Sequence, residues 1–154
     1  MTDKARSAEL ILKLYELRRE AVMREARNWF FAFNPESFED VQRAVMSEHS
    51  AYLRMVTTYW DMACSFVNHG AIDAEMFGDA NGEQVLVFAK LQPFLAEIRT
   101  NNGNPNAFRH LEQAVMAMPQ AEERVARARA MSKAVAQARA AANKESAEAD
   151  AANA

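Results

Sequence analysis

The side chains best suited to chemistry in this sequence gather in residues 54–73. Arg54, Asp61 and His69 stand there with the aromatic Tyr59, and we take all four as candidate ligand-binding residues. Arg54 and Asp61 share a helical azimuth but lie seven residues, about 10 Å, apart along a helix, which is too far for direct pairing. They are spaced to contact two points on a neighbouring helix or to bracket a small anionic ligand. The alternative is a solvated polar face with surface ion pairs.

The histidines do not form a recognisable metal motif. Ferritin-like di-iron sites need Glu three positions before His on facing helices, and none of the three histidines has it. His49 falls in an apolar sector, so we expect a neutral imidazole hydrogen-bonded in the core, with a ligand or metal contact as the alternative. His69 precedes Gly70, where a histidine can bond the last helical carbonyls. We assign no catalytic residue, no metal and no cofactor, and we favour a non-enzymatic protein.

The elements that position these residues are predicted to be helices, because helix-forming residues dominate and only four glycines and four prolines occur. Apolar residues at three- and four-residue spacing predict a first helix over 3–33, which Pro35 ends. A second helix is predicted over 37–69, with Ser37 as its N-cap and Gly70 after its end.

Shorter helices complete the prediction. They are expected at 74–77, at 83–100 with a kink at Pro93, after an N-cap at Asn104-Pro105, and from Pro119 to residue 143. Residues 144–154 contain no large apolar side chain and are expected to be disordered. The predicted fold class is therefore all-α: a helical bundle built on two long antiparallel helices plus shorter helices, forming a single domain over 1–143.

Length and composition limit the class of protein. A chain of 154 residues with half of them hydrophobic has one domain's length and enough apolar surface for a core. Its single cysteine, Cys64, allows no internal disulfide and is expected to be buried and inert. The first residues do not read as a signal peptide, and Asp61 interrupts the least polar stretch. We expect a cytoplasmic protein with no transmembrane segment.

The basic C-terminal region does not favour nucleic-acid binding. Residues 119–144 carry six basic against two acidic side chains, although the net charge of the chain is −3. On a helical wheel Arg124 and Arg127 lie on one side and Arg129 and Lys133 on the other. A surface that follows a phosphate backbone should gather its charges on one face.

Aromatic residues at the end of the first predicted helix indicate self-association. Trp29, Phe30 and Phe33 can share one broad apolar face, while Phe31 points nearly away from it. Clustered exposed rings commonly mark a contact surface, so Trp29, Phe30 and Phe31 are candidate interface residues of a homodimer. The alternative is that another helix of the same chain covers Phe31.

Several segments resemble a family of short bacterial helical proteins of unknown function. They are Tyr59-Trp60-Asp61-Met62-Ala63, His69-Gly70-Ala71-Ile72, Phe77, Asn81-Gly82-Glu83, Phe88-Ala89-Lys90 and Glu97-Ile98-Arg99. The resemblance covers residues 10–118, leaves the last helix outside, and implies no chemistry.

Two functions therefore stay open. The first is a non-enzymatic helical interaction module that self-associates, with a further protein partner as an option. The second is a small-ligand or metal-binding helical protein, or an enzyme, that uses residues 54–73.

Overall fold

The computed structural model describes residues 3–153, and every regular element in this range is helical. The α-helices and one 3₁₀ turn are, in chain order, α1 (Lys4–Arg18), α2 (Ala21–Ala32), α3 (Phe38–Val45), α4 (Ser50–Asn68), α5 (Ala74–Ala80), α6 (Glu83–Leu91), η1 (Gln92–Phe94), α7 (Leu95–Asn101), α8 (Arg109–Met116) and α9 (Ala121–Ala152). The all-α fold class is confirmed.

The expected helix over 3–33 is divided into α1 and α2. The carboxylate of Glu20 accepts hydrogen bonds from the backbone N–H groups of Val22, at 3.0 Å, and Met23, at 2.8 Å. Glu20 is thus the N-cap of a new helix, and the chain bends between Arg18 and Ala21. The apolar stripe continues across this bend, which explains why periodicity alone predicted one helix.

The expected helix over 37–69 is also divided, into α3 and α4, so neither long helix of the predicted bundle is continuous. Ser37 begins α3 in a capping box with Asp40, as its N-cap position predicted. Residues 46–49 separate the two helices. Gly70, after the end of α4, adopts a φ of +76°, the left-handed conformation that glycine takes without steric cost.

The shorter helices follow the prediction in part. Pro93 lies in the η1 turn between α6 and α7, where a kink was expected. The Asn104-Pro105 pair does not begin a helix, because α8 starts at Arg109 after Phe108 in the left-handed region at φ 57°.

The last helix is longer than expected, since α9 continues to Ala152 and residues 144–152 are helical where disorder was expected. Their high alanine content accounts for this, because alanine has the strongest intrinsic helix propensity. That residues 1–143 form one domain stays a prediction.

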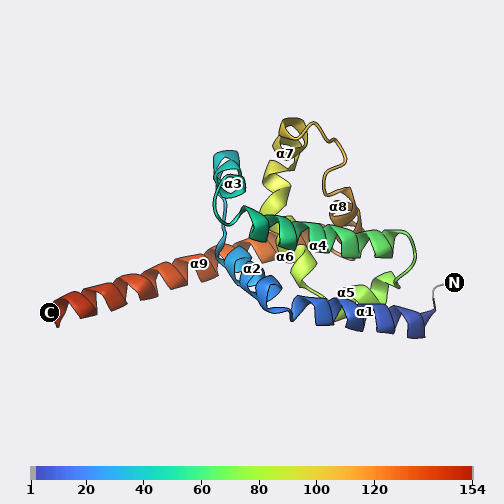
Figure 1. Cartoon of the computed structure of the whole chain (residues 1–154), viewed down its shortest axis with the longest axis horizontal. Coiled ribbons are helices and arrows are strands. Elements are labelled where there is room, and N and C mark those ends of the chain that lie inside the picture. The colour runs from blue at the N-terminus through green and yellow to red at the C-terminus, as the bar shows by residue number, and fades with distance from the viewer. Residues whose placement is uncertain (1–2, 154) are drawn as a thin grey trace.

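The core lies around α4, which packs against α2 on one side and α8 on the other, while α6 packs against α9. Figure 1 shows α4 crossing the middle of the body and α9 extending away from the other helices. Trp60 on α4 is 1% exposed, and Phe30 and Phe88 belong to the same buried core cluster. Cys64 is fully buried as expected, and burial together with the charge of Asp61 raises its pKa to about 12.

Lys90 on α6 is a buried cation at the C-terminal end of α2. Its Nζ donates hydrogen bonds to the carbonyl oxygens of Phe30 at 2.8 Å, Phe31 at 3.1 Å and Phe33 at 2.8 Å. Helix C-termini leave such carbonyls without partners within the helix, and a cation there also interacts favourably with the negative end of the helix dipole. Burial lowers the pKa of Lys90 to about 8, and the charge of Arg139 contributes. The ammonium is therefore still protonated at pH 7.

Candidate functional site

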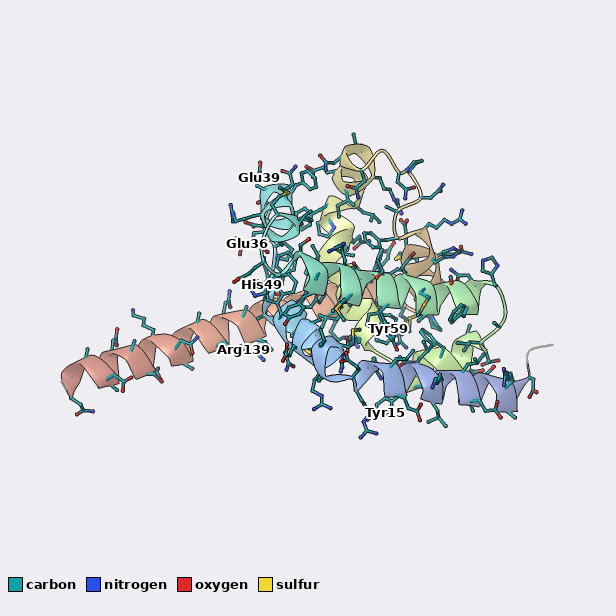
Figure 2. All side chains as sticks on the ribbon, in the orientation of Figure 1. Tyr15, Glu36, Glu39, His49, Tyr59 and Arg139 are labelled. Carbon is teal, nitrogen blue, oxygen red and sulfur yellow. The ribbon has the colours of Figure 1, made fainter. Side chains whose placement is uncertain are left out.

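The four candidate ligand-binding residues do not gather in one place: Tyr59 contacts α1, Asp61 and His69 lie beside α8, and Arg54 lies at the other end of α4. Tyr59 faces α1, where its hydroxyl donates a hydrogen bond to the carbonyl oxygen of Leu14. Burial raises the pKa of Tyr59 to about 12, so the phenol stays protonated. Figure 2 shows Tyr59 in the body of the molecule, above the labelled Tyr15 of α1. Tyr59 therefore joins α4 to α1.

Asp61 faces α8, on another side of α4. Its Oδ1 accepts a hydrogen bond of 2.9 Å from the backbone N–H of Leu111, in the first turn of α8. Two turns further along α4, the side-chain amide of Asn68 donates to the carbonyl oxygen of His110 at 3.0 Å. Asp61 thus contacts a neighbouring helix, one of the two roles expected for it. Because Phe108 offers α8 no side-chain cap, Asp61 supplies the missing acceptor.

His69 is the C-cap residue of α4 and is exposed. Its ring lies 5.5 Å from the ring of His110. Arg54 lies at the other end of α4, so Arg54, Asp61 and His69 do not line one pocket. His49, expected in the core, is instead half-exposed and stacks on Trp29 with ring centroids 5.3 Å apart. Within residues 3–153 we find no group of three metal-ligating side chains.

Arg54 is at the edge of an apolar groove between α3, α4 and α7. The groove has a volume of about 300 Å³. Its lining is mainly apolar and includes Phe38, Val41, Leu53, Leu91, Ile98 and Phe108. Met46, at one end, is 86% exposed. The guanidinium of Arg54 makes a long hydrogen bond of 3.4 Å to the Ser50 carbonyl, and no described carboxylate pairs with it.

A second polar cluster, which the sequence did not reveal, lies inside the fold around Glu83. The Glu83 carboxylate accepts hydrogen bonds from Arg27 Nε at 3.0 Å and Nη2 at 2.7 Å, and from Trp60 Nε1 at 3.2 Å. Arg18 approaches the same carboxylate to 3.6 Å. The side chains of Glu83, Arg27 and Arg18 are only 8%, 23% and 13% exposed. The hydrogen bond to Glu83 raises the pKa of Arg27.

This cluster holds α1, α2, α4 and α6 together at the bend between α1 and α2. The Arg18 guanidinium also lies over the Trp60 ring, 5.3 Å from its centroid. Glu83 and its partner Arg27 are 56 positions apart, so no local spacing predicts the pair. The available hint was that Glu83 and Trp60 both belong to the segments that carry the family resemblance.

The candidate interface residues at the end of α2 divide into buried and exposed ones. Phe30, expected at the interface, is instead in the core and 2% exposed. Trp29 is half-buried and stacks on Phe33 with ring centroids 5.0 Å apart. Phe31 alone of the three is exposed, at 36%. The loop after α2 contacts α9, where Ser132 donates a hydrogen bond to the side-chain oxygen of Asn34.

The outer part of α9 is exposed over many consecutive residues. Its first turns are packed, with Val125 2% exposed, but every residue over 137–152 is exposed. Where α9 leaves the body, Met131 is 63% and Val135 43% exposed. Figure 1 shows this part of α9 extending beyond all other helices. This outer part of α9, residues 131–152, we call the α9 arm.

Together these features define an all-helical protein with one apolar groove and one extended helical arm. Among the described residues, no helix is both long and apolar enough to cross a bilayer. The chain belongs to a family described as a domain of unknown function, DUF4760, whose model matches residues 5–118. No curated protein and no solved structure matches it. The resemblance to an uncharacterised helical family is thus confirmed, and α9 lies outside the matched region.

Proposed function

We propose that this protein is a non-enzymatic helical interaction module that self-associates, and that two copies pair through antiparallel α9 arms. The observation that carries the proposal is the separation of charge along the arm. Lys133, Arg139 and Lys144 lie nearer the body, and Glu145, Glu148 and Asp150 follow them. In an antiparallel pair the basic part of each arm lies beside the acidic part of the other. One patch is therefore complementary to itself, as a two-fold interface requires.

The charge order is unfavourable for an isolated helix. Acidic side chains at a helix C-terminus face the negative end of the helix dipole. An antiparallel partner places basic side chains beside them and opposes the dipole. In proteins most of the stability of a helix comes from packing of an apolar face, and residues 137–152 are all exposed. Pairing supplies the packing that the arm lacks within one chain.

Apolar side chains at the base of the arm add a second source of stability. Met131 and Val135 are one helical turn apart and both exposed. The exposed Phe31 lies at the end of α2, three residues before Asn34, which accepts a hydrogen bond from Ser132 of α9. We propose that Phe31 lies at the edge of the same dimer surface, and that Trp29 supports it. Cys64 is the sole cysteine and is buried, which suits a reducing, cytoplasmic compartment, and we propose a bacterial cytoplasmic setting.

The test is the mass of the full chain and of a chain without residues 144–154. We expect the full chain to have twice the monomer mass of 17.3 kDa by light scattering. The shortened chain lacks the acidic part of the arm, so we expect a monomer. At a concentration low enough that both chains are monomeric, its melting temperature should be close to that of the full chain, because the deleted residues that the structure describes are all exposed. A shortened chain that stays dimeric would refute the role of the arm.

Phe31→Ser tests the edge of the surface separately. If the partner copy covers Phe31, the variant should be folded and more monomeric than the wild type at the same concentration. If the same chain covers it, the melting temperature should fall with no change in mass. The second result would remove Phe31 from the interface and leave the arm as the sole proposed contact.

A second candidate function rests on Arg54 and the apolar groove. A cation without a carboxylate partner, at the rim of a groove of about 300 Å³, suits a small acid with an apolar body. Octanoate is a suitable probe: it should raise the melting temperature of the wild type, and Arg54→Ala should abolish this rise. Arg109→Ala, a change at an exposed arginine outside the groove, is the control. No rise in the wild type would reject this function.

A further inference from the structure

A basic cavity lies where α9 leaves the body. It has a volume of about 480 Å³ and lies between the loop after α2, the α6–η1 segment and the middle of α9. Lys90, Arg129 and Lys133 contribute cationic side chains to its lining, and Glu36 contributes a carboxylate. Figure 2 labels Glu36 in the loop after α2 and Arg139 on α9, on either side of this junction.

The cations around this cavity have no ion-pair partner among the described residues. Lys90 donates to three main-chain carbonyls. Arg129 donates from Nε and Nη2 to the Ala89 carbonyl, both at 3.2 Å, and from Nη2 to the Gln92 side chain at 2.8 Å. Lys133 is exposed, and no hydrogen bond holds its ammonium. Carbonyl groups satisfy the donors of Lys90 but cancel none of its net charge.

Arg139 adds a fourth positive charge, two residues beyond Gln137, the last residue of the cavity lining. It is close enough to contribute to the lowered pKa of Lys90, after the larger effect of burial. Four cations therefore lie near one carboxylate. Like charges at short range repel, and an anion within the cavity would relieve this repulsion.

We propose that this basic cavity binds a small phosphoryl anion. The ammonium of Lys133 and the undonated Nη1 of Arg129 are the groups free to donate to phosphoryl oxygens, and both are suited to them. A volume of about 480 Å³ exceeds what one inorganic ion needs and falls in the range of small-molecule sites. The phosphoryl group is thus expected to carry a further group, such as a second phosphate.

Such a ligand would connect α9 to the rest of the fold. Lys133 and Arg129 belong to α9, whereas Lys90 belongs to α6 and Asn34 to the loop after α2. Binding should therefore stabilise the base of the α9 arm. This inference rests on the cavity alone and does not require that the protein self-associates.

The test is calorimetric titration of pyrophosphate into the full chain and two charge-reversal variants. We expect saturable binding of one pyrophosphate per wild-type chain. Lys133→Glu should weaken binding about tenfold or more, as expected for losing one charged hydrogen bond. Arg127→Glu makes the same charge change on the same helix, but Arg127 does not line the cavity, so its affinity should be close to that of the wild type. Light scattering on both variants separates any change in self-association from the change in binding.

A second measurement distinguishes a soluble phosphoryl ligand from a lipid headgroup. Co-sedimentation with phosphatidylcholine vesicles containing phosphatidic acid tests a lipid headgroup. Binding to pyrophosphate that depends on Lys133 supports a soluble ligand, and vesicle binding alone with the same dependence supports a headgroup. If neither probe binds, or if Arg127→Glu weakens binding as much as Lys133→Glu, the proposed site is wrong.

Discussion

Arg27 and Glu83, 56 positions apart, form a two-point ion pair in which the Arg27 Nη2 lies 2.7 Å and its Nε 3.0 Å from the two carboxylate oxygens. The pair joins α2 to α6. Trp60 on α4 donates to the same carboxylate, and Arg18 at the end of α1 approaches it. One acidic side chain thus fixes the positions of four helices around the bend that divides the first predicted helix.

Glu83→Gln should destabilise the protein by about 3–5 kcal/mol, because it leaves two largely buried arginines without their anion. Urea unfolding followed by circular dichroism measures the loss. Glu16→Gln is the matched control, since Glu16 is 66% exposed and pairs only with the exposed Lys13. Its cost should be below about 0.5 kcal/mol. Equal costs for the two variants would show that the buried cluster contributes no more than a surface pair.

Trp60→Ala should cost about 3–5 kcal/mol, as expected for removing a buried aromatic ring. Trp60 is 1% exposed, its ring contacts Phe77, and Arg18 lies over its face. Trp60→Phe keeps much of the packing and removes the indole N–H, so its cost should be smaller. If Trp60→Ala unfolds at the same urea concentration as the wild type, Trp60 is not part of the core.

Lys90 should make stability depend on pH in alkaline solution. Its folded-state pKa of about 8 lies below its ordinary value of 10.5. Between these two values the unfolded chain binds more protons than the folded one, so the contribution of Lys90 to stability rises with pH in this window. The difference in unfolding free energy between the wild type and Lys90→Met should therefore increase from pH 8 to pH 10. Taking the difference cancels the tyrosines and other groups common to both proteins.

If the difference in unfolding free energy between the wild type and Lys90→Met stays constant from pH 8 to pH 10, the Lys90 ammonium keeps its ordinary pKa in the folded state. In either case Lys90→Met should be less stable at pH 7, because three carbonyl oxygens at the end of α2 lose their donor. The end of α2 should then show faster amide exchange.

Asp61→Ala should lower stability by about 1–2 kcal/mol through the loss of an acceptor at the start of α8. Amide exchange at Leu111 should become faster, since its N–H donates to Asp61. Asp79→Ala is the control, because Asp79 is exposed and carries no hydrogen bond that fixes a helix. If Asp61→Ala leaves both stability and Leu111 exchange unchanged, the carboxylate is free for a ligand after all.

Local signals in the sequence were sufficient to predict an all-helical chain but not every helix boundary. Ser37 with Asp40, Gly70 and Pro93 act through their immediate neighbours, so their roles could be predicted. The bend at Glu20 depends on a glutamate as N-cap, which is outside the common set of capping residues. Apolar periodicity continued across it and hid it.

The candidate sites were harder to predict because their partners are distant in the sequence. On a helical wheel Asp61 falls on the polar, solvated face. Its hydrogen-bond partner, the backbone N–H of Leu111, is 50 positions away in the sequence, so no local pattern indicates the contact. Lys90 looks like an ordinary surface lysine until the end of α2 is placed against it, 57–60 positions away. The charge order of the α9 arm was visible in the sequence. This charge order is relevant to pairing only if the arm is helical and exposed, and the structure shows both.

The most direct test of self-association through the α9 arm is a charge exchange followed by light scattering. One variant combines Arg139→Glu with Lys144→Glu, and the other combines Glu145→Lys, Glu148→Lys and Asp150→Lys. We predict that each variant alone is a monomer of about 17 kDa, since all charged side chains from residue 139 to residue 150 then have the same sign. An equimolar mixture should recover the dimer mass. Wild-type mass for both separate variants, or a monomeric wild type at high micromolar concentration, would contradict pairing through this arm.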